Sequence, residues 1–395
     1  MQILVFAIGI LLFIGLVLVH EWGHFIVAKR NGVESEEFGL GFPPRIWGRK
    51  LKSGMMLSLN ALPLGGFVKL KGENDSDERK GSLGAASLSS KAKIMLAGVT
   101  MNLLAGLFLL TILAWVGMPK LLTQDNVGQD QFTVKSDTKV IRQELLTGAI
   151  QPGSPASKSG LRGTDQLVSI AAKGQVKQVK TTLQIHNATQ AFAGQKVLIT
   201  YIRHGQTLTT TAQLLSNKVV QASLNTDNPK GYLGIVPAAI QIQRSTWSAP
   251  VVAVGLTGQI FKLTFIGLGH ALGGLGSTIA GGVTGNHAAR INGQSQASSQ
   301  VGGPVAIGVA LWDYGSLGLN FMIFLIALIS LTLALMNVLP IPALDGGRLT
   351  MMLISRGIFR RPLSRLAEER IVGASFLVLL ALIVLITVVD VKRFF

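Results

Sequence analysis

The feature that most constrains this chain is a cluster of ionisable residues inside an apolar run. Residues 20–24 read HEWGH, and every residue from Ile3 to Val19 is apolar or glycine. Phe25 to Ala28 continue the run, and Lys29 and Arg30 end it. A run of this length predicts one membrane-spanning helix. Two imidazoles and a carboxylate are costly inside a bilayer, so their presence there indicates a functional site.

The composition supports a membrane protein with a soluble insert. Hydrophobic residues make up 48% of the chain and charged residues only 14%, which is unlike an ordinary soluble protein. The net charge of +17 could indicate nucleic-acid binding, but the basic clusters flank apolar runs, as the positive-inside rule expects. We therefore expect no nucleic-acid partner. The chain has no cysteine, which excludes thiolate zinc sites. The first apolar run lacks the basic region of a cleavable signal peptide, so we expect it to be retained.

The order of apolar runs and basic loops predicts how the chain crosses the membrane. The loop from Lys29 to Lys93 holds twelve Lys or Arg, which places it in the cytoplasm and the N-terminus outside. The uncharged stretch from Ile94 to Val116 is long enough to return the chain to the outside. Gly98, Asn102 and Gly106 share one face of that span, because they recur every fourth residue. Small residues there would allow close helix contact, and Asn102 could hydrogen-bond across the interface. Of these, helix packing is the main role that we expect for this stripe.

Two stretches predict β-structure. Residues 55–71 alternate apolar and polar side chains around a turn at Pro63 and Gly65-Gly66, which predicts a β-hairpin. It could be an ordinary surface hairpin, or a membrane-associated strand edge that pairs with an extended peptide. Residues 148–170 resemble the centre of PDZ domains and lie in a stretch of soluble composition. A helix from Thr181 to Ala193 and strands at Lys196–Arg203 and Thr207–Leu214 complete this expected domain.

The HEWGH motif has the ligand spacing of a zinc site. His20 and His24 project from one face of a helix, because they are four residues apart, and they can hold one zinc ion. Glu21 can accept a proton from a zinc-bound water, whose pKa zinc lowers to about 7. This chemistry predicts Glu-assisted attack of that water on a peptide bond. A catalytic zinc site also needs a third protein ligand and one open position.

Asp345 is the best candidate for the third ligand. Like the histidines, it lies a few residues from a predicted cytoplasmic boundary, which Arg348 marks. The apolar, glycine-rich stretch from Trp247 to Val283 bears on this assignment, because it could either cross the membrane or lie along its surface. If this stretch crossed the membrane once, Asp345 would lie on the opposite side of the membrane from His20. About four transmembrane helices are therefore favoured.

The segment before Asp345 has features of a functional site and not only those of a helix end. It reads NVLPIPALDGG from Asn337 to Gly347, and Pro340 and Pro342 each remove a backbone donor. Unwound backbone at membrane depth needs support from protein or from a water-filled cavity. A hydrolytic zinc site needs such a cavity, so we expect a functional role for this segment.

In chain order, HEWGH, the PDZ-like segment, GGP at 302–304 and NVLPIPALDGG resemble the site-2 protease family of intramembrane zinc metalloproteases. The resemblance covers nearly the whole chain and is closest to the bacterial regulator-of-sigma-E protease type. It implies that His20, His24 and Asp345 hold one Zn2+ ion and that Glu21 is the catalytic residue. It also implies substrate-binding roles for Asn337, Asn60, Pro340 and Pro342.

The resemblance implies regulated intramembrane proteolysis, such as cleavage of anti-sigma factors or of signal-peptide remnants. The substrates would be single-span proteins, already cut on the outer side in some cases and surrounded by membrane lipids. The rival hypothesis is a membrane scaffold or metal-binding membrane protein without hydrolytic activity. An inactive protein would be expected to have lost Glu21 or a ligand, and this chain keeps them all. One departure is Val99 after Gly98, where the family often has proline.

The expected fold is a polytopic α-helical membrane protein with a membrane-associated β-hairpin and one inserted PDZ-like α+β domain. We expect it in the bacterial cytoplasmic membrane, with the N-terminus and the PDZ-like domain extracytoplasmic and the active site near the cytoplasmic side. The predicted segments are a first span (1–28), a cytoplasmic loop with the hairpin (29–93), a second span (94–117), the PDZ-like domain (120–235), an interfacial amphipathic segment and loop (236–300), the GGP segment and third span (301–345), a cytoplasmic loop (346–370) and a fourth span (371–389).

Overall fold

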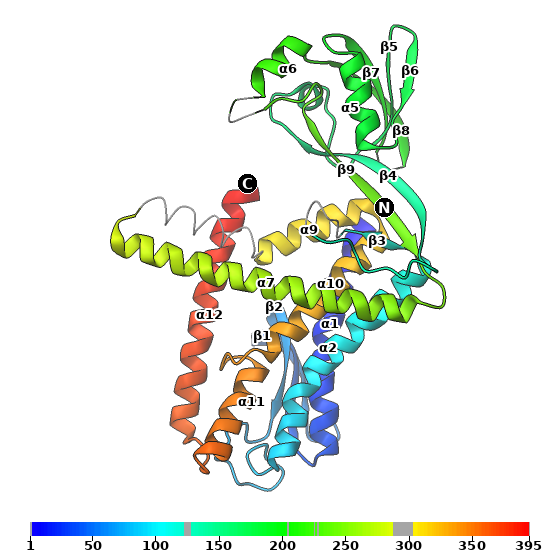
Figure 1. Cartoon of the computed structure of the whole chain (residues 1–395). Helices are drawn as coiled ribbons and strands as arrows, with labels where there is room; N and C mark the ends of the chain where they lie inside the picture. The colour runs from blue at the N-terminus through cyan, green and yellow to red at the C-terminus, as the bar shows by residue number, and fades with distance from the viewer. Residues whose placement is uncertain are drawn as a thin grey trace. The chain divides into compact units, whose positions relative to one another are not determined.

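The computed structural model describes residues 2–121, 128–203, 205–224, 226, 229–286 and 303–394 (Figure 1). The chain divides into two compact units, and each is described by itself. One unit comprises Met1–Val5, Ile112–Val252 and Trp312–Met322, and the other comprises Phe6–Thr111, Ala253–Leu311 and Ile323–Phe395. Gly302 of the GGP segment and the end of the predicted 236–300 segment, from residue 287, lie outside the described residues.

Long apolar helices dominate the second unit. The helices are α1 (Gln2–Arg30), α2 (Leu88–Val116), α7 (Ala249–Thr284), α9 (Pro304–Leu317), α10 (Leu319–Val338), α11 (Asp345–Leu353) with a π-helical turn (Ile354–Ile358), and α12 (Arg365–Phe394). Among the described residues, α1, α2, α7, α10 and α12 are long and apolar enough to cross a membrane. Four of the five match the predicted spans. The fifth, α7, is the stretch for which the sequence left two possibilities.

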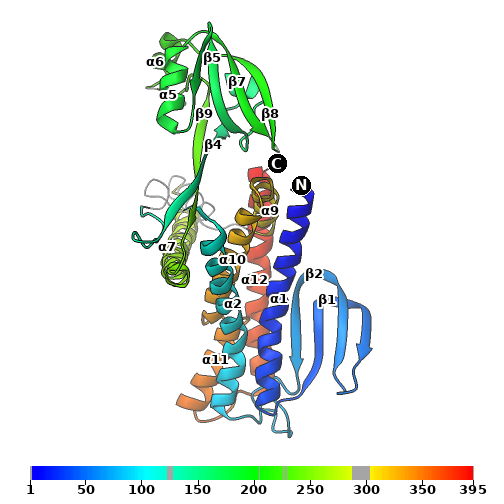
Figure 2. The same cartoon turned by 90° about the vertical axis from the view of Figure 1, so that its right-hand side faces the viewer.

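The direction of α7 differs from that of the other long helices in this unit. It is seen along its length in Figure 1, crosswise to the direction of α12, and almost end-on in Figure 2. A transverse helix suits the interfacial placement that the four-span topology requires. That placement stays a prediction.

A small antiparallel sheet lies beside α1 (Figure 2). It consists of β1 (Ser35–Lys50) and β2 (Met56–Leu70). The first part of β1 lies between the two arms of β2, because Phe38 pairs with both Leu57 and Val68. The later part of β1 pairs with the first arm alone, as Trp47 does with Leu59. The spatial order of the segments is therefore 66–70, 35–42, 56–62 and 45–50.

The predicted hairpin of residues 55–71 is wrong in its pairing. Its two arms pair with β1 and not with each other. The strand β1 was not expected, because Gly39, Gly41 and Pro43-Pro44 are more typical of turns than of strands. In the folded chain Gly39 has a packing role, since a Cβ atom there would lie 2.4 Å from the ring of Phe67.

The other unit contains a seven-stranded sheet among its described residues. The strands are β3 (Met118–Lys120), β4 (Lys139–Ile150), β5 (Gln166–Ala172), β6 (Gln175–Gln178), β7 (Lys196–Arg203), β8 (Gln206–Gln213) and β9 (Ile235–Arg244), and the helices are α4 (Pro155–Lys158), α5 (Thr182–Ala191) and α6 (Asn217–Ser223). The strand order is β3-β9-β4-β5-β7-β8, and β6 pairs with β5. Buried Leu145, Ile170, Ile185 and Ile199 belong to one apolar core.

The secondary structure expected for residues 181–214 is confirmed by α5, β7 and β8. The helix begins where Thr181 Oγ1 accepts a hydrogen bond from the backbone N–H of Gln184, at 3.2 Å. The predicted domain end at residue 235 is wrong, because β9 continues the sheet by pairing with β4. This pairing joins segments about ninety residues apart, and no local sequence pattern reveals it. The assignment to PDZ domains stays a prediction.

Candidate metal centre

His20, His24 and Asp345 bring three ligand atoms together in the helical unit. The Nε2 atoms of His20 and His24 are 3.2 Å apart. Asp345 Oδ2 lies 3.3 Å from the first Nε2 and 3.2 Å from the second. A tetrahedral zinc ion with bonds of about 2.0–2.1 Å holds its ligand atoms about 3.3 Å apart. The three side chains therefore fit one zinc ion and leave the fourth position open.

The ring of His24 is held by the backbone of α2. Its Nδ1 lies 2.7 Å from the carbonyl oxygen of Ile94, and the residue is buried. A carbonyl oxygen can only accept, so Nδ1 carries the ring proton and donates it. The lone pair then stays on Nε2, which is the tautomer that a zinc ligand needs.

Asn102 of α2 contacts the ring of His20 at the corresponding nitrogen. Its amide Nδ2 lies 3.2 Å from His20 Nδ1, while its Oδ1 is buried with no hydrogen-bond partner among the described residues. The two amide atoms are interchangeable by a half-turn of the side chain. After that half-turn, Oδ1 accepts the proton that a metal-bound imidazole carries on Nδ1. Acceptance from His20 Nδ1 thus gives Asn102 Oδ1 a partner, and it leaves Nε2 of His20 free to bind zinc.

The sequence allowed a hydrogen bond from Asn102 across the helix interface, but it did not indicate His20 as the partner, and helix packing was the main role expected for the stripe of Gly98, Asn102 and Gly106. Packing is correct for Gly106, since a Cβ there would lie 2.6 Å from Leu331 Cδ2. The available signal was a polar side chain among small residues on a membrane helix.

Glycines let α1 and α2 approach each other at the metal centre. A Cβ at Gly98 would lie 2.3 Å from His24 Nε2 and 2.5 Å from His20 Cε1. A Cβ at Gly23, inside the HEWGH motif, would lie 2.8 Å from the carbonyl oxygen of Ala97. Real Cβ atoms do not approach this closely. The second span therefore forms one wall of the site and leaves room only for the two imidazoles and what they bind.

Asp345 reaches the histidines because α11 begins directly against the end of α10. A Cβ at Gly346 would lie 2.1 Å from the carbonyl oxygen of Val338, and one at Gly347 would lie 1.9 Å from that of Ile341. Only residues without a side chain fit at these two positions. The Asp-Gly-Gly sequence thus combines a candidate ligand with the two glycines that bring it into place.

Glu21 lies between the metal ligands and the sheet. Its carboxylate is close to the backbone amide of Val68. A Cβ at Gly66 would lie 3.4 Å from Glu21 Cγ and 3.2 Å from Val17 Cγ1, so the last arm of β2 rests against α1. Within the described residues this arm pairs with β1 alone. A strand edge is therefore present next to the candidate catalytic carboxylate.

The predicted substrate-binding residues occupy different places. Asn60 is buried in the sheet, where its Nδ2 donates to the carbonyl oxygen of Gly41 at 3.1 Å. Asn337 lies in the last turn of α10 and is partly buried, and Pro340 and Pro342 lie in the turn before α11. Asn60 thus supports the sheet from within, and the substrate roles of all four residues stay predictions.

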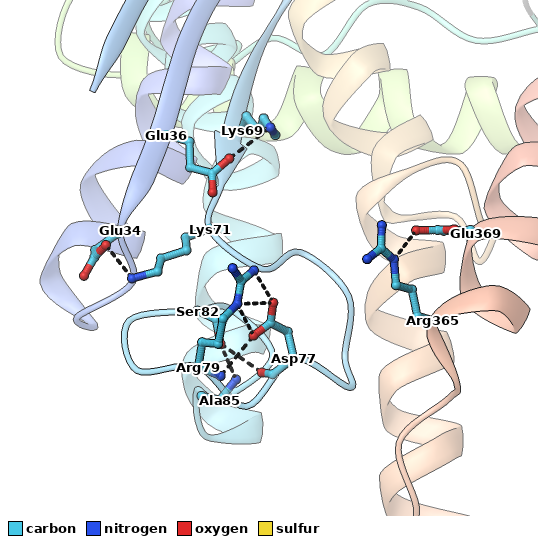
Figure 3. A network of polar contacts seen from close by, with 10 residues as sticks. All are labelled: Glu34, Glu36, Lys69, Lys71, Asp77, Arg79, Ser82, Ala85, Arg365 and Glu369. Atoms are coloured by element: carbon cyan, nitrogen blue, oxygen red, sulfur yellow. Dashed lines mark hydrogen bonds and ion pairs between the residues drawn. The ribbon is translucent and has the colours of Figure 1, made fainter. Parts of the chain in front are cut away.

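A charged cavity of about 960 Å³ lies beside the start of α11. Its lining includes Ala343, two residues before Asp345, and Arg348, three residues after it. Two ion pairs in its wall, Glu36–Lys69 at 2.9 Å and Arg365–Glu369 at 2.7 Å, are seen in Figure 3. Such walls favour water. The lining contains neither Glu21 nor the three candidate ligands, so this hydrated cavity is a neighbour of α11 and not part of the metal centre.

The family model described as peptidase family M50 matches residues 8–382. A protein of Clostridium perfringens whose name assigns it to the zinc metalloproteases is 28% identical, over 97% of each chain. A protein of a Nostoc species with the same designation is 29% identical, over 93% of this chain and 90% of the relative. The regulator of sigma-E protease RseP of Escherichia coli is 24% identical, over 92% of this chain and 94% of the relative.

Proposed function

Since this chain belongs to peptidase family M50, the site-2 proteases, and is a zinc metalloprotease of the membrane, we propose the following roles for the residues of its candidate metal centre. His20, His24 and Asp345 hold the zinc ion, and Glu21 is the catalytic base and acid. The observation that carries this assignment is the triangle of ligand atoms, each 3.2–3.3 Å from the other two. The substrate is a membrane-spanning segment of another protein.

The catalytic step uses one proton and one water. When bound, zinc supplies a Lewis acid that acidifies water and polarises the peptide carbonyl. The Glu21 carboxylate takes a proton from the attacking water, whose oxygen forms a bond to the carbonyl carbon. Glu21 then gives that proton to the amide nitrogen as the C–N bond breaks. The products are one carboxylic acid and one amine, which exchange a proton in water to become carboxylate and ammonium, and Glu21 returns to its starting carboxylate form.

The sheet beside α1 presents the substrate. A peptide bond in a helix is shielded by its own hydrogen bonds, so the substrate must unwind before cleavage. Pairing with the strand edge at Gly66–Leu70 replaces those bonds and holds the peptide extended next to Glu21. The position of Gly66 against Val17 and Glu21 supports this route.

The β-rich unit contributes recognition outside the membrane. A cavity of about 300 Å³ lies between α5 and the start of β9, and its lining includes Ile185, His186 and Gly231–Ile235. A groove between a helix and a strand is a common place for an extended peptide to add to a sheet. This supports recognition of a freshly cut substrate end over a role as a size filter alone.

The test is replacement of Glu21 by Gln in the full-length protein. Purified Glu21→Gln should keep one zinc ion and lose cleavage of a co-expressed single-span substrate. The matched control is Glu34→Gln, an exposed carboxylate paired with Lys71 at 2.8 Å, which should cleave normally. Cleavage by Glu21→Gln, with fragment ends mapped to the same bond, would reject the mechanism. No cleavage by the wild type against any membrane-embedded substrate would favour a metal-binding scaffold.

A further inference from the structure

An apolar cavity of about 220 Å³ lies between α1 and the sheet. One wall consists of Phe13, Ile14 and Val17 of α1, and the other consists of Leu40, Gly41, Leu59, Asn60 and Gly65. The single polar side chain in this lining is Asn60, and its amide nitrogen is already engaged by the carbonyl oxygen of Gly41 at 3.1 Å. The lining is therefore apolar, and the amide nitrogen of Asn60 is already used in a hydrogen bond within the protein.

The cavity is continuous with the candidate catalytic face of α1. Val17 precedes Glu21 by four residues and shares its helix face. The same backbone segment of β2 touches both, because a Cβ at Gly66 would contact Val17 Cγ1 at 3.2 Å and Glu21 Cγ at 3.4 Å. Gly65, the neighbour of Gly66, lines the cavity. A peptide leaving Glu21 toward the N-terminal end of α1 therefore passes the cavity next.

Helix and strand geometry give the position of the substrate residue that reaches it. Val17 and Phe13 lie about 6 and 12 Å from Glu21 along the axis of α1, at about 1.5 Å per residue. An extended peptide advances about 3.3 Å per residue. The cavity is thus two to four residues away from the scissile bond.

The size and lining select the chemistry of the occupant. A cavity of roughly 150 Å³ lined by Leu, Ile and Phe accepts a molecule as large as benzene in another protein. This cavity can therefore take one leucine-sized or aromatic side chain, and an ionised side chain would be buried there without a partner.

Resting on the proposed function, we propose that this cavity is a specificity subsite of the protease. It accepts one large apolar side chain of the substrate, two to four residues from the cleaved bond, on the side that faces the N-terminal end of α1. The residues that decide its depth are Phe13, Ile14 and Leu59. Within an apolar substrate segment, the subsite therefore favours cleavage where a large side chain, and not a small one, stands at that position.

The experiment uses a single-span substrate whose cleaved bond has been mapped with the wild-type enzyme. Each position from two to four residues on either side of that bond is replaced in turn by Ala, Leu, Phe or Asp. The enzyme variants are Ile14→Trp, which fills the cavity, and Ile14→Ala, which deepens it. Leu11→Trp is the matched control, because Leu11 lies on the same helix but is exposed and does not line the cavity.

On one side of the bond only, Leu or Phe should be cleaved roughly tenfold faster than Ala, since apolar pockets discriminate by about that factor. Asp at that position should abolish cleavage. Ile14→Trp should lower the Phe-to-Ala ratio about tenfold, Ile14→Ala should raise it, and Leu11→Trp should leave it unchanged.

Two results would overturn the subsite while leaving the proposed function intact. One is cleavage of the Asp substrates as fast as the Leu substrates at every position. The other is a Phe-to-Ala ratio that is the same in wild type and both Ile14 variants. Cleavage that persists in Glu21→Gln, or is absent from the wild type, would instead overturn the proposed function and the subsite with it.

Discussion

Asn102 of α2 and His20 of α1 meet across the interface of the first two membrane helices, with 3.2 Å between the amide and the ring Nδ1. Because this contact sets which ring nitrogen faces the metal, Asn102→Ala should weaken zinc binding by about 10–100-fold. Competition with a chromophoric chelator measures that loss. Thr100→Ala is the control, since Thr100 Oγ1 donates only to the carbonyl oxygen of Leu96 in its own helix. Equal affinities in the two variants would contradict the role given to Asn102.

Gly98→Ala should empty the metal centre. The added methyl would occupy space 2.3 Å from His24 Nε2, and the ring cannot move away because its Nδ1 is held by Ile94 at 2.7 Å. Gly106→Ala, on the same face of α2, meets Leu331 Cδ2 and Cγ at 2.6 Å and no candidate metal ligand, so it should retain zinc. Metal analysis of the two purified proteins gives the comparison. Full zinc occupancy in Gly98→Ala would show that the two helices are free to separate.

The sequence was most informative where the spacing within a short motif fixes the relative positions of its side chains. His20 and His24 share a helix face by spacing alone, and Asp345 followed from the charge map. The supporting residues were harder to predict. Asn102 sits in a stripe of small residues, which usually indicates packing, and its contact with His20 depends on how two distant helices cross.

The sheet beside α1 was the least predictable part of the fold. The sequence of β1 contains Gly39, Gly41 and two consecutive prolines, which are local signals for a turn. Its pairing with both arms of β2 is a long-range property, and only the arms themselves showed a strand pattern. The last strand, β9, was not predicted for the same reason, because its partner β4 is remote in the sequence.

Asp75 is the most buried carboxylate of the loop that follows the sheet, and its removal should destabilise the protein. It is 2% exposed, it forms an ion pair with the fully buried Lys91, and it accepts from Arg356 Nε at 2.8 Å. Asp75→Ala leaves two cations without their partner, which typically costs about 3–5 kcal/mol when a buried pair is broken. Glu369→Ala removes the exposed pair with Arg365 seen in Figure 3 and should have little effect.

Thermal unfolding of the detergent-solubilised proteins tests this difference. The melting temperature of Asp75→Ala should fall well below that of the wild type, whereas Glu369→Ala should unfold close to it. If both variants unfold together with the wild type, the buried cluster around Asp75 does not stabilise the fold.

Asp137 should make the stability of the protein depend on pH in the acid range. Its carboxylate accepts from Ser248 Oγ at 2.6 Å and from the backbone N–H groups of Thr246 and Ser248 at 2.8 and 3.0 Å, just before α7 begins. The hydrogen bonds from Ser248 and Thr246 hold the pKa of Asp137 well below its ordinary value. A carboxyl whose pKa is depressed by folding stabilises the folded state above its unfolded pKa, about 3.9, and loses that contribution as the pH falls.

Asp137→Asn should therefore lower the melting temperature at neutral pH, because the charge that these donors favour is gone. The difference from wild type should be constant between about pH 6 and pH 8. It should shrink below about pH 4, where the carboxyl of the unfolded wild-type chain begins to be protonated while that of the folded chain stays ionised. Glu78→Gln, at an exposed carboxylate, is the control and should show no such trend. A difference that grows on acidification would reverse the sign of the linkage and contradict the stabilising role given to the Asp137 carboxylate.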